Sequence, residues 1–193
     1  MIKTILYNIL SAFGQAFGFS ALIAVLFMFF YRQCRQDGLK STLTKWVMEL
    51  KEKKEFRKVF LLAFYAALVL FRTLFNRFAW TNPLQNVIGT FGIYNANGEL
   101  TTEAIENVLL FIPLMLLWLW VADKQEFSFI KTLSFAVKNA LLCSFLIEMA
   151  QLLLRVGQVQ ISDLVYNTLG GIIGGVCYWI TIWAKKKVKR NAI

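Results

Sequence analysis

Long apolar runs separated by short charged segments dominate this chain and predict membrane-spanning helices. The first run extends from about Ile9 to Tyr31, which is long enough to cross the ~30 Å hydrocarbon core of a bilayer. Further spans are predicted at Val59–Asn76, Ala104–Val121, about Ser134–Leu154 and about Asp163–Ala184. We therefore expect an all-α fold, a polytopic integral membrane bundle of about five transmembrane helices.

The first run has a rival interpretation as a cleaved signal peptide. Only Lys3 provides positive charge before the run, and no small-residue cleavage site follows it. A signal peptide normally has both a basic start and such a site. We therefore expect this segment to be retained as the first transmembrane helix.

The positions of the basic residues predict an orientation for the bundle. Segment 32–58 carries nine Lys and Arg residues, segment 122–138 carries three and segment 185–193 carries five, which is 17 of the 21 in the chain. Five crossings place all three segments on one side, and basic loops stay in the cytoplasm. We expect the N-terminus outside and the C-terminus inside. Topology then explains the net charge of +10, with attraction to anionic lipid as a secondary effect and no need for nucleic-acid binding.

Composition narrows the class of protein and of chemistry. Hydrophobic residues make up 58% of the chain and charged residues 17%, whereas soluble domains carry about 25% charged residues. An ordinary soluble globule and a disordered chain are excluded. Three isolated Cys and no His exclude a zinc ribbon, a disulfide framework and a histidine triad. Acid–base chemistry would have to rest on carboxylates, Lys, Tyr or Cys.

The chain divides into three expected regions. Residues 1–58 form the first transmembrane helix and a basic cytoplasmic linker, residues 59–184 form a four-helix membrane core, and residues 185–193 form a basic cytoplasmic tail. Apolar residues at helical spacing within 39–58 predict an interfacial amphipathic helix, and a solvated linker helix is the alternative. The turn-rich segment 77–103 is expected to cap the outer side as a re-entrant or surface-lying loop.

Polar residues lie near the outer end of each of the four later spans. The candidates are Arg72, Glu106, Asn107, Glu148, Gln151, Arg155, Asp163 and Asn167. Glu148, Gln151 and Arg155 are spaced i, i+3 and i+7, which places them on one helical face. A charge in lipid costs about 2.5–3.5 kcal/mol on translocon scales, so we expect these residues to pair around an outward-facing polar cavity. The alternative is a hydrogen-bond and ion-pair network that only fixes helix packing.

Small residues and one proline predict how the helices approach each other. Gly170, Gly171, Gly174 and Gly175 form two overlapping small-residue pairs at the spacing typical of close helix packing. We expect them to contact a neighbouring helix rather than a ligand or a second copy of the chain. Pro113 lies within the predicted span 104–121, where a kink would widen the mouth of the cavity.

Four motifs carry a family resemblance. They are Phe71-Arg72-Thr73-Leu74; Glu106-Asn107 followed by Leu110-Phe111-Ile112-Pro113; Glu148-Met-Ala-Gln151 with Arg155; and Asp163-Leu-Val-Tyr-Asn167-Thr-Leu-Gly170-Gly171 with Gly174. From about Val59 to the C-terminus the chain resembles the VanZ-like membrane proteins. The resemblance implies a protein of the Gram-positive bacterial plasma membrane, similar to those linked to low-level tolerance of teicoplanin, a lipid-bearing glycopeptide antibiotic.

Two hypotheses of function follow, and they belong to different classes. In the first, the cavity binds a lipid head group, or the acyl-linked part of the drug, without chemistry. Its expected partners are membrane lipids, a lipid-linked cell-wall precursor or the glycopeptide, with no cofactor and no metal. Arginine suits such a site because it makes bidentate phosphate contacts.

The second hypothesis is an intramembrane enzyme acting on a lipid-linked cell-wall precursor or a phospholipid. Glu106, Glu148 and Asp163 would hold a divalent cation or supply a general base. A transporter ranks third, because neither an internal repeat nor a second, inward-facing polar cluster is evident in the sequence.

Overall fold

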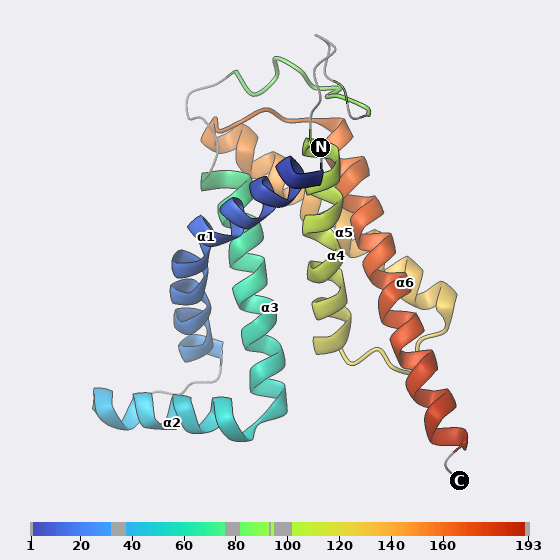
Figure 1. Cartoon of the computed structure of the whole chain (residues 1–193). Coiled ribbons are helices and arrows are strands. Elements are labelled where there is room, and N and C mark those ends of the chain that lie inside the picture. The colour runs from blue at the N-terminus through green and yellow to red at the C-terminus, as the bar shows by residue number, and fades with distance from the viewer. Residues whose placement is uncertain (1, 32–37, 76–81, 93, 95–101, 192–193) are drawn as a thin grey trace.

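The computed structural model describes residues 2–31, 38–75, 82–92, 94 and 102–191, and within these ranges the regular secondary structure is helical. The elements are α1 (Ile2–Tyr31), α2 (Leu39–Glu52), α3 (Lys54–Leu70), the π-helical turn η1 (Phe71–Phe75), α4 (Glu103–Val121), α5 (Phe129–Leu154) and α6 (Ile161–Asn191). Five of the helices run along one bundle and α2 lies across one of its ends (Figure 1). The prediction of an all-α bundle is confirmed.

Four helical stretches are long and apolar enough to cross a membrane. They are Lys54–Phe75, Glu103–Val121, Phe129–Leu154 and Ile161–Asn191. In α1 the apolar stretch Ala16–Tyr31 is shorter. These four spans confirm a multi-pass membrane fold, and the fifth predicted crossing, in α1, stays a prediction.

Helix α1 runs antiparallel to α3 along one flank of the bundle (Figure 1). Aromatic contacts fix this register: the ring centroids of Phe17 and Phe64 on α3 are 5.2 Å apart, and those of Phe19 and Phe71, just beyond α3, are also 5.2 Å apart. Edge-on and tilted aromatic pairs at such distances stabilise helix contacts beyond the area that they bury. The first helix is therefore part of the packed bundle.

The amphipathic segment forms a helix of its own. The sequence predicts helical structure over 39–58, and the structure divides this range between α2 and α3, with Lys53 extended (φ −98°, ψ 113°) at the junction. Trp46 on α2 packs edge-on against Phe56 and Phe60 of α3. Leu43 and Val47 remain exposed, as expected of a helix that lies on a membrane surface.

Glycines allow α6 to contact α4 and α5 at close range. A Cβ atom on Gly174 would lie 2.5 Å from the carbonyl oxygen of Ile112 on α4, and Gly170 faces α4 in the same way. A Cβ atom on Gly171 would overlap Ala140 on α5. Two adjacent faces of α6 therefore carry the contacts, which confirms the expected close packing.

Helix α4 continues through Pro113 as a single helix from Glu103 to Val121. The proline therefore does not end the helix, and a widened cavity mouth stays a prediction. The departure from α-helical geometry lies elsewhere, in η1, where the chain of α3 continues through a π-helical turn containing Arg72. Single π-helical turns occur often at functional sites.

Candidate functional site

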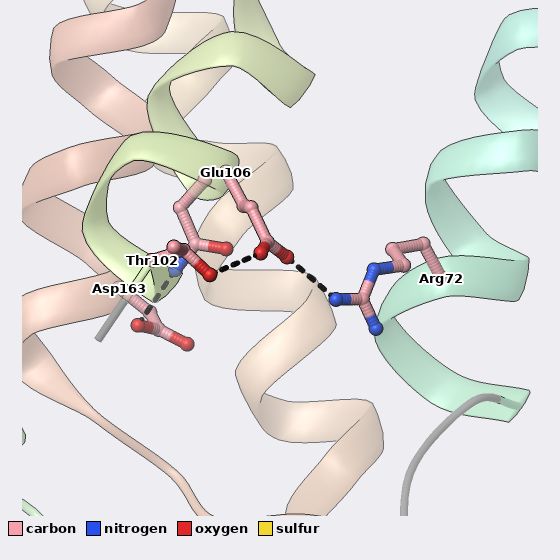
Figure 2. Close-up of polar contacts among 5 residues, drawn as sticks. Arg72, Thr102, Glu106 and Asp163 are labelled. Carbon is pink, nitrogen blue, oxygen red and sulfur yellow. Dashed lines mark hydrogen bonds and ion pairs between the residues drawn. The ribbon is translucent and has the colours of Figure 1, made fainter. Parts of the chain in front are cut away.

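Arg72 of η1 forms an ion pair with Glu106 of α4. Arg72 Nη2 lies 2.6 Å from Glu106 Oε2, and Thr102 donates its hydroxyl to Glu106 Oε1 over 2.5 Å (Figure 2). The Arg72 side chain is 31% exposed and that of Glu106 is 14% exposed. Glu106 lies in the first turn of α4, where the helix dipole also stabilises a negative charge. Both carboxylate oxygens are therefore bonded.

Asp163 and Asn107 form a second contact, which joins α6 to α4. Asn107 donates from Nδ2 to Asp163 Oδ1 over 2.8 Å, and both residues are buried. Asp163 lies in the first turn of α6, so it too benefits from a helix N-terminus. Figure 2 shows Glu106 and Asp163 entering from neighbouring helices while Arg72 approaches from the other side.

Glu148 and Gln151 are almost completely buried on α5, and each bonds to backbone. Glu148 Oε2 accepts the N–H of Gln160 over 2.9 Å, just before α6 begins. Gln151 donates from Nε2 to the carbonyl oxygen of Thr73 in η1 over 2.9 Å. The two side chains therefore tie the end of α5 to both of its neighbours in the site.

Asn167 links α6 to α5 one turn deeper, donating from Nδ2 to the hydroxyl of Ser144 over 2.9 Å. Its Oδ1 atom is buried with no hydrogen-bond partner among the described residues, and the same is true of Gln151 Oε1. A buried acceptor without a donor costs about 1–3 kcal/mol. Two such acceptors in one region suit a ligand that brings N–H or O–H groups.

Arg155 does not share the face of Glu148 and Gln151, and that prediction is wrong. Helix α5 ends at Leu154, and Arg155 adopts a left-handed backbone (φ 53°) with an exposed side chain. A residue outside the helix leaves the i, i+3, i+7 pattern. We call the other seven predicted residues the polar cluster: Arg72, Glu106, Asn107, Glu148, Gln151, Asp163 and Asn167.

The structure adds participants that sequence reasoning missed. Thr73, Thr102, Ser144 and the backbone of Gln160 each bond a member of the polar cluster. The sequence did contain a signal for the role of Ser144, because it is a polar residue within an apolar span, one helical turn from Glu148. The sequence contained no signal for the role of the Thr73 carbonyl, because a π-helical turn does not change the hydropathy pattern.

A backbone strap covers the start of α6 beside the polar cluster. The N–H of Val159 donates to Pro83 O over 2.9 Å and that of Ile161 to Val87 O over 2.8 Å. Gly89, with φ 76°, leaves no room for a Cβ atom beside Ser162. The described residues 82–92 belong to the segment predicted to cap the bundle, and residues 76–81 and 95–101 lie outside the described ranges.

The acidic residues do not assemble into a cation site. No group of three or more His, Cys, Asp or Glu side chains that could hold a metal ion occurs in the part of the chain that the structure describes. Glu106 is bonded by Arg72 and Thr102 instead, and Asp163 by Asn107. The geometry gives no support to a divalent cation shared by the three carboxylates.

Comparison with known proteins covers nearly the whole chain. A family profile described as VanZ/LLP1 matches residues 5–183. Protein VanZ from Enterococcus faecium is 28% identical over 130 residues, which cover 63% of this chain and 73% of that protein. No solved structure matches the chain. The range matched by the profile contains every residue of the polar cluster.

Proposed function

The chain belongs to the VanZ/LLP1 family, and from this premise we propose that its polar cluster binds the head group of a membrane lipid in the outer leaflet. By holding that lipid, or the acyl-linked part of the drug, the protein would contribute to tolerance of teicoplanin-like lipoglycopeptides. The chain is a multi-pass bacterial membrane protein, and a cluster at the ends of its spans would meet lipid head groups.

The observation that carries the proposal is the excess of acceptors over donors in the polar cluster. The cluster contains three carboxyl groups and one guanidinium, which pairs with Glu106. In addition, Gln151 Oε1 and Asn167 Oδ1 lack donors among the described residues. A head group with an ammonium or hydroxyl would supply those donors. Arg72 is partly exposed, and one of its guanidinium nitrogens donates to Glu106. The other N–H groups of the guanidinium can therefore donate to a phosphate.

Two zwitterionic lipids test the head-group chemistry directly. Phosphatidylethanolamine carries three ammonium donors beside its phosphate, whereas phosphatidylcholine has the same charge and no such donor. With matched acyl chains, native mass spectrometry of the purified protein should show preferential retention of phosphatidylethanolamine by about tenfold, the effect of one charge-assisted hydrogen bond. Equal retention of both lipids would contradict donor recognition by the polar cluster.

Drug susceptibility tests whether the polar cluster serves tolerance. Arg72→Lys, Glu148→Gln and Asp163→Asn keep side-chain size but change charge or bidentate geometry. Each should abolish teicoplanin tolerance while folded protein persists in the membrane. The matched control is Arg155→Lys, which alters an exposed arginine outside the helical face. Full protection by the three stably folded cluster variants would show that the cluster is not the site.

The enzyme hypothesis is distinguished by turnover of the bound lipid. The carboxylates are bonded within the protein, and they do not form a cation site among the described residues. We therefore propose binding without chemistry. Incubation of the purified protein with isotope-labelled phosphatidylethanolamine should return the lipid unchanged, and a product that disappears in Glu148→Gln would establish catalysis instead.

A further inference from the structure

An apolar cavity of about 490 Å³ lies among α1, α3, α4 and α5. Its walls include Phe27 of α1, Ala63 and Ala66 of α3, Trp118 of α4, and Ile147 and Ala150 of α5. Every side chain that lines it is hydrophobic. The cavity is distinct from the polar cluster, which lies at the ends of the same helices.

Small residues on facing helices leave this space. Ala63, Ala66 and Ala67 occupy the wall formed by α3, and Ala150 lies opposite on α5. Several larger lining residues, among them Phe27 and Leu146, are exposed, so the cavity opens on the side of the bundle that faces lipid. An apolar space of this size gives water no hydrogen-bond partners, and leaving it empty forfeits dispersion contacts along its walls. Hydrocarbon is therefore the expected filling.

The cavity reaches the polar cluster at one end. Val69 lines it, and Thr73, one turn further along, donates its hydroxyl to the carbonyl oxygen of Val69 over 2.9 Å. Ala150 lines it as well, and the next residue, Gln151, donates to Thr73 O. Gln151 is 1% exposed and keeps an unpartnered Oε1. A buried acceptor thus marks the boundary between the apolar cavity and the polar cluster.

We propose that this cavity takes one acyl chain of a membrane phospholipid whose head group lies at the polar cluster. The inference rests on the proposed function and adds the second half of the ligand. The acyl chain enters laterally between α1 and α5, and its polar end lies toward Gln151. Recognition then has two parts: an apolar slot that holds the acyl chain, and a polar cluster that binds the hydrogen-bond donors of the head group. The ligand class is a phospholipid whose head group carries hydrogen-bond donors.

Filling the cavity tests the proposal. Ala66→Phe and Ala150→Leu place new side chains in the space, and Leu142→Phe, on an exposed face of the same α5, is the matched control. With phosphatidylethanolamine as the probe, native mass spectrometry should show at least tenfold weaker binding by the two filled variants and unchanged binding by the control. Unchanged binding by folded Ala66→Phe and Ala150→Leu would overturn the acyl slot.

A crosslinking measurement on the unaltered protein covers the case in which a filled variant does not fold. Phosphatidylethanolamine with a diazirine at mid-chain should label peptides that contain Ala63, Ala66 and Ile147. Labelling spread evenly over the exposed faces of α5, Leu142 included, would contradict a dedicated slot. Preferential labelling by a teicoplanin acyl chain, or protection of the lining by a second copy of the chain, would also overturn the choice of phospholipid.

The two proposals fail in different ways. If Arg72→Gln abolishes binding of phosphatidylethanolamine and cavity filling does not, the head-group site stands and the acyl slot fails. If cavity filling abolishes binding and Arg72→Gln does not, the slot stands and the polar cluster is not the head-group site.

Discussion

Glu106 and Asp163 occupy equivalent positions, each in the first turn of a helix. Negative charges are stabilised there by the helix dipole, which lowers the cost of keeping two carboxylates in a mostly apolar bundle. Neither relies on this effect alone, since Glu106 binds Arg72 and Asp163 binds Asn107. At the residue scale the site is a set of specific pairs, and their energies can be measured.

The Arg72–Glu106 pair should appear as a coupling energy. Removing one member of a buried ion pair costs about 3–5 kcal/mol, and partial exposure of Arg72 reduces the expected loss to about 1–3 kcal/mol. Arg72→Gln and Glu106→Gln should each destabilise the protein, and the double variant should lose less than the sum by about 1 kcal/mol or more. Thermal unfolding in detergent measures all three.

The control for this cycle is Arg155→Gln combined with Glu106→Gln. Arg155 is exposed and lies outside the helical face, so its effect should add to that of Glu106→Gln within about 0.5 kcal/mol. Additive losses in the Arg72 cycle as well would show that no stabilising pair exists.

Seven of the eight predicted polar residues bond to other elements or loops near the ends of the spans, and their depth in a membrane stays a prediction. The pairing among these residues could not be predicted, since the sequence offered three carboxylates as possible partners for Arg72. Arg155 was misplaced because the pattern assumed a continuing helix. Gly157, with φ 69°, was the overlooked signal, since a glycine shortly after an apolar run often marks a helix end.

At the element scale, α6 organises the bundle through two adjacent glycine faces. Gly170 and Gly174 meet backbone carbonyls of α4, while Gly171 and Gly175 meet alanines of α5. Close approach of these backbones replaces the hydrophobic drive that water provides to soluble bundles. The spacing predicted the contacts but could not assign each face to a particular helix.

Gly174→Leu should prevent native packing, because even its Cβ atom would lie 2.5 Å from Ile112 O. Overpacking typically costs about 1–3 kcal/mol, and a clash with backbone should reach at least the upper value. Ile173→Leu changes an exposed neighbour and should be neutral. The fraction of monodisperse protein after detergent extraction measures the effect; a well-folded Gly174→Leu protein would contradict the α4 contact.

The junction of α2 and α3 shows what hydropathy leaves undetermined. Nothing in the segment Glu52-Lys53-Lys54 resembles a turn signal, yet the chain changes direction at Lys53. The turn is stabilised by tertiary contacts, since Trp46 of α2 packs edge-on against Phe56 and Phe60 of α3. One turn into α3, Lys58 is buried, lies 2.8 Å from Glu55, and its Nζ lies 5.6 Å from the centre of the Trp120 ring. A lysine at the start of a span thereby keeps charge partners.

For the whole molecule, hydropathy was sufficient to predict an all-helical, multi-pass membrane fold, because a bilayer admits few spanning structures. Four of the predicted spans are long and apolar enough to cross a membrane. The apolar cavity could not be predicted. Ala63, Ala66 and Ala150 are ordinary residues of apolar spans, and only the arrangement of α1, α3, α4 and α5 around them determines whether their small side chains leave a space. The division into regions 1–58, 59–184 and 185–193 stays a prediction.

The structure brings the three basic segments to one end of the bundle. Helix α2, the turn after α4 and the end of α6 all lie at this end (Figure 1), and Lys186 donates from Nζ to Gln125 O over 2.9 Å. Basic segments of short loops stay cytoplasmic. The orientation, with the polar cluster at the outer end and the C-terminus inside, stays a prediction that rests on this distribution of charge.

Single cysteines in a background without native cysteines test that orientation. Asn86→Cys lies in the exposed strap beside the polar cluster, and Glu126→Cys lies in the turn at the opposite end, where Glu126 is 93% exposed. In intact cells an impermeant maleimide should label Asn86→Cys and leave Glu126→Cys unlabelled, and permeabilisation should expose both. Labelling of Glu126→Cys alone would show that the bundle has the opposite orientation, with the basic end facing outward. The polar cluster would lie at the cytoplasmic leaflet, out of reach of an extracellular glycopeptide, and its role in tolerance would have to be abandoned.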